Sequence, residues 1–207
     1  MAVLVLGSAL AACGGDEERA DADEPSGKFP VQVTDSRFPD RQLLANATNL
    51  ELEVENVGTE QVPDLTVTIY LQRNADGPFS IRSKQPGLAN PNRPVWILEE
   101  GYPKLRAPGE SLSELQRAPP AGAEVAQPNT FAFGPMAPGD TKRMVWRVTP
   151  IDGGTYTVNY EVAAGLHGQA KAVTPSGGPV KGSFSVRIET EPPETRVNDR
   201  GKVVPID

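Results

Sequence analysis

Cysteine and histidine are almost missing from this chain of 207 residues, in which each occurs once, as Cys13 and His167. A single cysteine cannot form a disulfide within the chain, so packing and hydrogen bonds must hold the fold. The two residues are also too few for a zinc site with the usual nitrogen and sulfur ligands, or for a blue-copper site. His167 stands between glycines in Gly165-Leu166-His167-Gly168, and we interpret it as a solvated loop residue. We therefore expect no metal and no cofactor.

Recognisable catalytic motifs are missing as well. The sequence contains no Gly-x-Ser-x-Gly, no Ser-x-x-Lys and no phosphate-binding glycine loop. An enzyme needs a nucleophile, a base or a metal in a defined arrangement, and no set of residues here provides one. We therefore expect a protein that is not an enzyme. An envelope hydrolase with an unrecognised pair of acidic residues stays open as an alternative.

Positive charge is scarce, with 20 lysines and arginines against 27 aspartates and glutamates and a net charge of −7. Nucleic-acid binding requires clustered basic residues, so we expect no nucleic-acid partner. The same balance argues against direct electrostatic docking on anionic lipid headgroups. Aromatic residues make up only 6% of the chain, whereas 20 glycines and 21 prolines predict many turns and loops.

The apolar run at residues 2–12 is too short to cross a bilayer as a helix, which takes about 20 residues. It ends in Leu10-Ala11-Ala12-Cys13, which resembles the lipobox of bacterial lipoproteins. The resemblance implies that residues 1–12 are a signal peptide, that the signal peptidase recognises Leu10, Ala11 and Ala12, and that the sulfur of Cys13 carries diacylglycerol. Two acyl chains would anchor the protein to the outer face of the bacterial cell membrane.

One feature of this leader departs from the usual pattern. No lysine or arginine precedes Cys13, although signal peptides begin with a positive segment, so we expect the natural start to lie upstream. A buried free cysteine in an N-terminal strand or helix is the alternative. The acidic, glycine-rich residues that follow Cys13 argue against that alternative.

Composition divides the remainder of the chain into three parts. Residues 13–27 are polar and acidic, and we interpret them as a disordered tether. Residues 28–190 carry the apolar patterns of a domain. Residues 191–207 are polar and rich in proline, and we interpret them as a tail.

Alternation of apolar and polar residues predicts strands throughout the domain. The clearest strand is 49–56, where Leu50, Leu52 and Val54 alternate with glutamates. Similar patterns predict strands near residues 29–33, 65–71, 79–81, 131–133, 143–148, 156–162 and 184–188. About seven strands with almost no helix predict an all-β, Ig-like antiparallel β-sandwich. We expect Trp146 at the centre of its core.

Residues 84–128 interrupt the strand pattern, and we expect them to form a long loop insertion. Ser111-Leu112-Ser113-Glu114 has the spacing of a capping box and predicts one short helix, ended by the prolines at 119 and 120. Trp96 and Tyr102 lie beside prolines and are candidates for an exposed binding surface. The alternative, which we favour for Trp96, is that its side chain is buried and closes the core of the sandwich.

Two structural motifs resemble bacterial Ig-like modules of the CARDB and related kinds. The strand that ends in Asn56-Val57-Gly58 resembles their opening half. The turn Ala137-Pro138-Gly139-Asp140, followed by a strand and then by Gly154-Thr155-Tyr156, resembles their closing half. The resemblance covers about half of residues 45–165 and implies a module that binds, spaces or scaffolds. It brings no catalytic motif.

These observations together predict a membrane-anchored, extracytoplasmic lipoprotein that acts as a binding or scaffolding module at the cell envelope. Its expected partners are the membrane, through the lipid, and an envelope protein or a glycan. A lipoprotein that binds a small ligand or a carbohydrate through residues 84–128 is the alternative. A deep pocket beside the insertion would favour that alternative, and a flat apolar patch would favour a protein partner.

Overall fold

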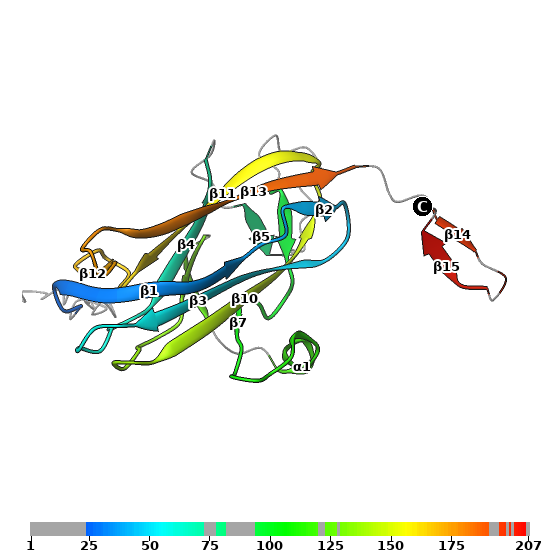
Figure 1. The fold of residues 1–207 in the computed structure, drawn as a ribbon. Coiled ribbons are helices and arrows are strands. Elements are labelled where there is room, and N and C mark those ends of the chain that lie inside the picture. The colour runs from blue at the N-terminus through cyan, green and yellow to red at the C-terminus, as the bar shows by residue number, and fades with distance from the viewer. Residues whose placement is uncertain are drawn as a thin grey trace, which may run out of the picture.

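The computed structural model describes residues 24–72, 78–81, 94–119, 123–127, 129–190, 195–197, 199 and 201–205. The predicted signal peptide, Cys13 and most of the predicted tether lie outside these residues. The described chain folds into an Ig-like β-sandwich of two curled sheets that face one another (Figure 1). The fold class predicted from the alternation is therefore confirmed.

The first sheet has the strand order β12-β1-β3-β10-β6-β5, and β7 also pairs with β10. Its long central strands are β1 (Gly27–Arg37), β3 (Thr48–Asn56) and β10 (Thr141–Pro150), which pair antiparallel. Its short strands are β5 (Phe79–Ile81), β6 (Trp96–Leu98), β7 (Lys104–Leu105) and β12 (Ala170–Val173).

The second sheet has the order β2-β13-β11-β4-β9-β8. Its long strands are β4 (Thr66–Leu71), β11 (Gly154–Ala163) and β13 (Val180–Glu189), which pair antiparallel. Its short strands are β2 (Arg41–Leu43), β8 (Glu124–Gln127) and β9 (Thr130–Ala132). A hairpin of β14 (Thr195–Val197) and β15 (Val203–Pro205) forms a separate two-stranded sheet.

Strand β3 shows why the sequence folds in this way. Leu50, Leu52 and Val54 are fully buried between the sheets, whereas Glu51 and Glu53 point to the outer face. Side chains alternate across a strand, so the alternating sequence fixes which face is buried. Each fully buried aliphatic side chain contributes about 1.5–3 kcal/mol to folding.

The core is centred where the sequence predicts. Trp146 is fully buried, and the rings of Phe131 and Phe133 approach it edge-on with centroids 5.8 and 5.6 Å away. Edge-to-face packing of this kind adds to the energy of burial. Val158 is fully buried on β11, and its neighbour Asn159 faces outward.

The predicted turns and helix are also present. Gly139 has a φ of +80° in the turn before β10, a conformation that glycine adopts without strain. Ser111 caps α1 (Leu112–Arg117) by accepting the Glu114 N–H, while the Glu114 carboxylate accepts the Ser111 N–H at 2.8 Å. This reciprocal pair is the predicted capping box.

Four expectations need correction. The sheets are mixed, because β1 pairs parallel with β12, β13 with β2, and β5 with β6. The described strands outnumber the predicted seven, since short strands extend both sheets. Residues 84–128 are not all loop, because β6 and β7 join the first sheet and β8 joins the second. The predicted tail contains the hairpin of β14 and β15, whose two strands pair through backbone hydrogen bonds.

Candidate functional site

Trp96 lies in the core. It is fully buried, with the rings of Phe38 and Phe79 against it at centroid distances of 5.5 and 6.2 Å and that of Tyr156 at 5.6 Å. Its Nε1–H donates to Oε1 of buried Gln42 at 2.7 Å, which satisfies the only polar group of the indole. The expectation that Trp96 forms an exposed binding surface is therefore wrong, and the alternative of a core plug is correct.

Tyr102 is buried as well, with 8% of its surface exposed. The Nζ of Lys104 lies 4.8 Å from the centre of its ring and donates to the carbonyl oxygens of Leu115 and Ala118 at 3.0 and 2.6 Å. Burial, with a smaller effect from Glu99, raises the pKa of the Tyr102 hydroxyl. Tyr102 and Lys104 thus hold the end of α1 against the sheet, and Tyr102 is not available as a surface aromatic.

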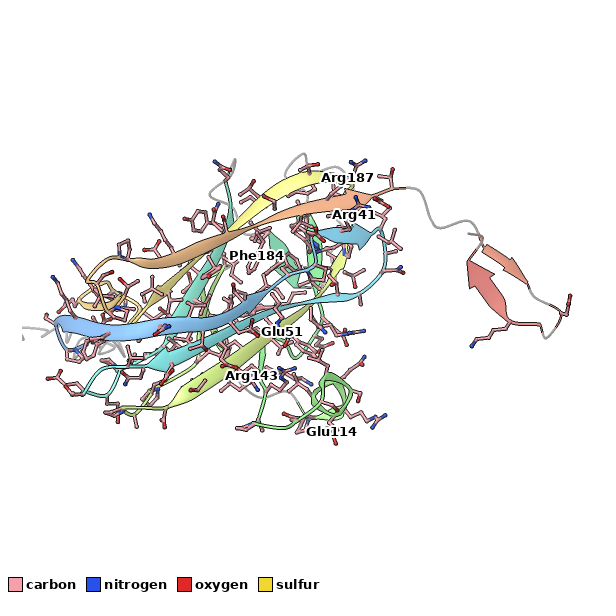
Figure 2. All side chains as sticks on the ribbon, in the orientation of Figure 1. Arg41, Glu51, Glu114, Arg143, Phe184 and Arg187 are labelled. Carbon is pink, nitrogen blue, oxygen red and sulfur yellow. The ribbon has the colours of Figure 1, made fainter. Side chains whose placement is uncertain are left out.

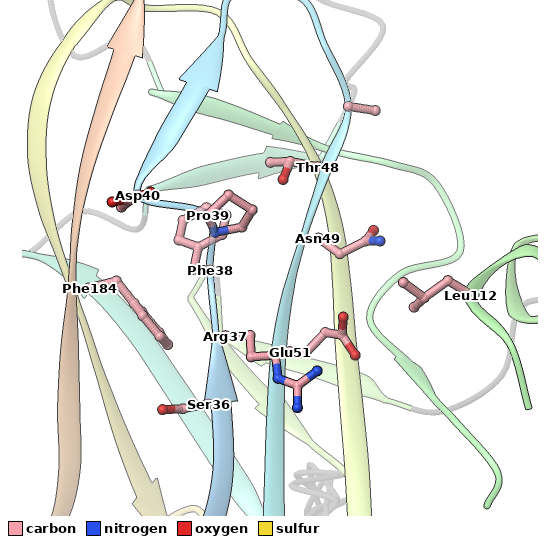
Figure 3. Close-up of a pocket in the computed structure, with 11 residues that line it drawn as sticks. Ser36, Arg37, Phe38, Pro39, Asp40, Thr48, Asn49, Glu51, Leu112 and Phe184 are labelled. Atoms are coloured by element: carbon pink, nitrogen blue, oxygen red, sulfur yellow. The ribbon is translucent and has the colours of Figure 1, made fainter. Parts of the chain in front are cut away.

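An open hollow of about 670 Å³ lies over the edge of the sandwich near the junction of β1 and β2 (Figure 3). Segments that are far apart in the sequence build it, since β1, β3, α1 and β13 all contribute. Its lining consists of Ser36, Arg37, Phe38, Pro39, Asp40, Ala47, Thr48, Asn49, Glu51, Leu112 and Phe184. We call this feature the edge hollow.

The edge hollow combines an aromatic side with a charged side. Phe38 and Phe184 meet edge-on with centroids 5.9 Å apart, and Phe184 is only partly buried. On the other side, Glu51 forms an ion pair with Arg106 at 3.1 Å, and Arg37 forms one with Asp35 at 2.9 Å. Rings beside fixed charges and the Asn49 amide suit a polar ligand with apolar parts, such as a peptide or a sugar.

Further ion pairs extend across the outer face of the first sheet. Glu53 on β3 pairs with Arg143 on β10, and Glu99 pairs with Arg147 at 2.6 Å. Figure 2 shows Glu51 and Arg143 on this face. Partly exposed pairs of this kind contribute little to stability, about 0–1 kcal/mol each. Their main effect is to neutralise a face that carries several carboxylates.

A second, more polar hollow of about 850 Å³ lies at the end of β11 and β13. Its lining consists of Gly153, Gly154, Thr155, Arg187, Ile188, Glu189 and Thr190. We call it the polar hollow. Next to it, the Tyr156 hydroxyl donates to Asp152 Oδ2 at 2.9 Å. Burial, and then this hydrogen bond, raise the pKa of Tyr156 to about 12, so the hydroxyl stays protonated.

Glu24, the first residue that the structure describes, is bound to the segment that leads into β12. Its carboxylate accepts the backbone N–H groups of His167 and Ala170 at 2.9 and 2.7 Å. Burial alone would raise the pKa of Glu24, but these donors outweigh it and the pKa is lowered. A side chain at Gly165 would collide with this carboxylate. Residues 24–27, expected to belong to the disordered tether, are therefore held by the fold, and His167 is exposed as predicted.

The described residues do not bring together the side chains that metal binding requires. Among the described residues, no group of three or more histidine, cysteine, aspartate or glutamate side chains could hold a metal ion. Burial lowers the pKa of Lys142, whose Nζ donates to the carbonyl oxygen of Gly134 at 3.0 Å. No helix in the described ranges is both long enough and apolar enough to span a membrane.

The lipidation prediction for Cys13, with its recognition residues Leu10, Ala11 and Ala12, falls outside the described residues. Neither hollow was predicted from the sequence. The glutamates of β3 were correctly placed on a wet face, but their arginine partners come from segments about 50–90 residues away, which no local pattern indicates.

Comparison with known proteins gives only distant likenesses. No protein family's sequence model matches the chain, and no curated protein matches it in sequence. A CARDB domain from Pyrococcus furiosus, solved in complex with di-metal ions, is 16% identical over 80% of this chain and 99% of its own, with a TM-score of 0.41. Part of native alpha-2-macroglobulin from Escherichia coli is 12% identical over 84% of this chain and 21% of its own, with a TM-score of 0.42.

A third solved protein, AvmM, which catalyses macrocyclization in alchivemycin A biosynthesis, is 12% identical over 80% of this chain and 90% of its own, with a TM-score of 0.39. The three proteins differ in their described roles. Likeness at this level assigns neither a family nor a function to this chain.

Proposed function

We propose that this chain is a lipid-anchored, extracytoplasmic lipoprotein whose β-sandwich acts by binding or scaffolding at the bacterial cell envelope, without catalysis. The observation that carries the proposal is the order of three features along the chain. The lipobox-like Leu10-Ala11-Ala12-Cys13 comes first and an acidic polar segment follows, and Glu24, the first residue that the structure describes, is already bound to the sandwich.

The small number of residues between these features determines how far the sandwich could lie from the lipid anchor. Glu24 is eleven positions after Cys13. An extended chain covers at most about 3.3–3.6 Å per residue, so the sandwich would stay within roughly 40 Å of the lipid. Because Glu24 is fastened to the loop at His167 and Ala170, that end of the sandwich would face the membrane.

The edge hollow supports the binding part of the proposal. It is open, and it offers aromatic surface beside fixed charges. These properties fit a protein segment or a glycan chain at the envelope. A small ligand or carbohydrate held there is the second candidate, favoured by the Asn49 amide beside the Phe38 and Phe184 rings. Leu112 is the one lining residue that comes from the segment 84–128.

The anchor is tested by mass spectrometry of the protein extracted from membranes. The expected N-terminal peptide begins at Cys13 and carries diacylglycerol. A Cys13→Ser variant should leave the membrane fraction. Intact residues 1–12 with an unmodified thiol would refute the lipoprotein.

The binding role is tested in intact cells by photo-crosslinking. A photoreactive amino acid at Ser36, on the rim of the edge hollow, should capture one defined envelope component. The matched control carries the same group at exposed Glu161 on the second sheet and should not capture that component. Equal capture from both positions would mean that the hollow is not the binding surface.

A further inference from the structure

Two arginines stand side by side on the outer face of the second sheet. Arg41 on β2 and Arg187 on β13 are direct partners in the parallel register of these strands. Both are exposed, while the residues next to them, Gln42 and Ile188, are buried. Alternation therefore directs both guanidinium groups to the same outer face. Figure 2 shows them at the end of the sandwich where β2 lies.

The pair is not neutralised within the described chain. None of the ion pairs among the described residues includes Arg41 or Arg187, although the protein has a net charge of −7. Glu189 follows on the same face of β13, and Asp40 precedes Arg41, but neither carboxylate pairs with either arginine. Like charges directly opposite one another destabilise a sheet, so an unpaired arginine couple is unfavourable unless an anion joins it.

The surroundings of the pair are built for an anion with several oxygens. Thr155 on β11 is the register partner of Arg187, so Thr155, Arg187 and Arg41 form one row across three strands. The Thr155 side chain is exposed in this row, and Thr155 and Arg187 both line the polar hollow. Neighbouring strands are about 4.8 Å apart, which lets two long arginine side chains reach one group between them.

We infer that Arg41 and Arg187, together with Thr155, form a binding site for a phosphate group. One guanidinium fork already saturates the two oxygens of a carboxylate. A phosphate has more acceptor oxygens and up to two negative charges, which match two guanidinium groups and a hydroxyl. The site does not depend on lipidation of Cys13.

The position of the site in the fold favours a soluble source of phosphate. The start of β1, at Gly27, and strand β2, which begins at Arg41, lie at opposite ends of the sandwich, because β1 runs along its length between them (Figure 1). If the chain is anchored through Cys13, the arginine pair faces away from the anchoring membrane. A phosphate-bearing polymer or a free phosphate ester is then closer to the site than the lipid headgroups are.

Isothermal titration calorimetry of the full chain with inorganic phosphate tests the site. Arg41→Gln and Arg187→Gln should each weaken binding at least tenfold, and added sodium chloride should weaken it in the unaltered protein. Lys181→Gln is the matched control, since Lys181 is equally charged and exposed on the same outer face of β13, where its register partner is Glu161 instead of an arginine. It should bind phosphate as the unaltered protein does, and none of the three variants should have a lower melting temperature than the unaltered protein.

Three results would overturn the inference. The first is the absence of phosphate binding, the second is an equal loss in Lys181→Gln, and the third is equal affinity for malonate, a dicarboxylate. Two arms separate the sources: soluble polyphosphate, and vesicles of phosphatidylglycerol offered to the Cys13→Ser chain. Binding in either arm supports the site and identifies its ligand.

Discussion

Asn56 offers the sharpest test of how the Asn-x-Gly motif works. It ends β3 and is fully buried. Its Nδ2 donates to the carbonyl oxygens of Glu60 and Met136 at 2.9 and 3.0 Å, and its Oδ1 accepts the Gly58 N–H at 3.0 Å. Its backbone N–H donates to Asp140 O at 2.9 Å. One side chain thus joins the loop after β3 to the turn before β10.

The structure gives the cost of removing this side chain. Asn56→Ala deletes three hydrogen bonds in a buried place, and each contributes about 1 kcal/mol, so we expect a loss of roughly 3 kcal/mol in the free energy of unfolding. For a domain of this size each kcal/mol lowers the melting temperature by about 2–4 °C, which gives a decrease of roughly 6–12 °C. The strands themselves stay intact, so the circular dichroism spectrum at 20 °C should not change.

Urea unfolding and differential scanning calorimetry measure this loss. Asn159→Ala is the matched control, because Asn159 faces outward from the middle of β11 and forms none of the side-chain hydrogen bonds identified among the described residues. It should change the free energy of unfolding by less than about 0.5 kcal/mol. An Asn56→Ala variant as stable as Asn159→Ala would falsify the assignment of Asn56 as the link between the two loops.

Three further predictions concern the core and the hydrogen bonds of Glu24. Val158→Asp should abolish folding, as judged by circular dichroism, because it places an unpaired charge in the core, and Asn159→Asp should fold normally. Gln42→Met should cost about 1–3 kcal/mol in urea unfolding followed by tryptophan fluorescence, since it leaves the Trp96 N–H buried without an acceptor; an unchanged midpoint would contradict this. Glu24→Gln should cost about 1 kcal/mol at pH 7. Because the folded pKa of Glu24 is lowered, its contribution is present above the unfolded value and is lost as the pH falls through the folded value. The two proteins should therefore converge as the pH falls below 4.5, the ordinary value for glutamate; a constant difference would exclude the carboxylate as its source.

The long strands could be predicted because burial repeats every second residue. β3, β10, β11 and β13 each carry enough alternating positions for one face to be identified. Two apolar residues in each of 79–81 and 131–133 were enough to predict β5 and β9, but the other described strands of two to four residues carry no such signal. Whether β2 and β12 exist is decided by the backbone of β13 and β1, with which they pair in parallel. The parallel pairing that makes both sheets mixed therefore could not be predicted from the local sequence.

Trp96 shows why the candidate site could not be placed from sequence. The run Val95-Trp96-Ile97-Leu98 is apolar enough for a core strand, and the flanking prolines are equally typical of an exposed loop. Its burial is decided by β10, because Pro150 is its register partner, and by Gln42, which accepts the indole hydrogen from a position 54 residues earlier. The edge hollow could not be predicted from the sequence for the same reason, since Phe38 and Phe184 meet only after both sheets have formed.

The charged side chains of the two outer faces differ in whether they form ion pairs, and this difference indicates on which face an anion would bind more tightly. On the first sheet, Glu51, Glu53 and Glu99 each have an arginine partner, so a ligand there would have to break an existing pair. On the second sheet, Arg41 and Arg187 face one another without a carboxylate from the described chain. An anion that binds between them relieves the repulsion between the two guanidinium groups and also forms new hydrogen bonds with them. An anion that binds on the first sheet does neither. Of the two faces, the second is therefore the one on which an anion gains most.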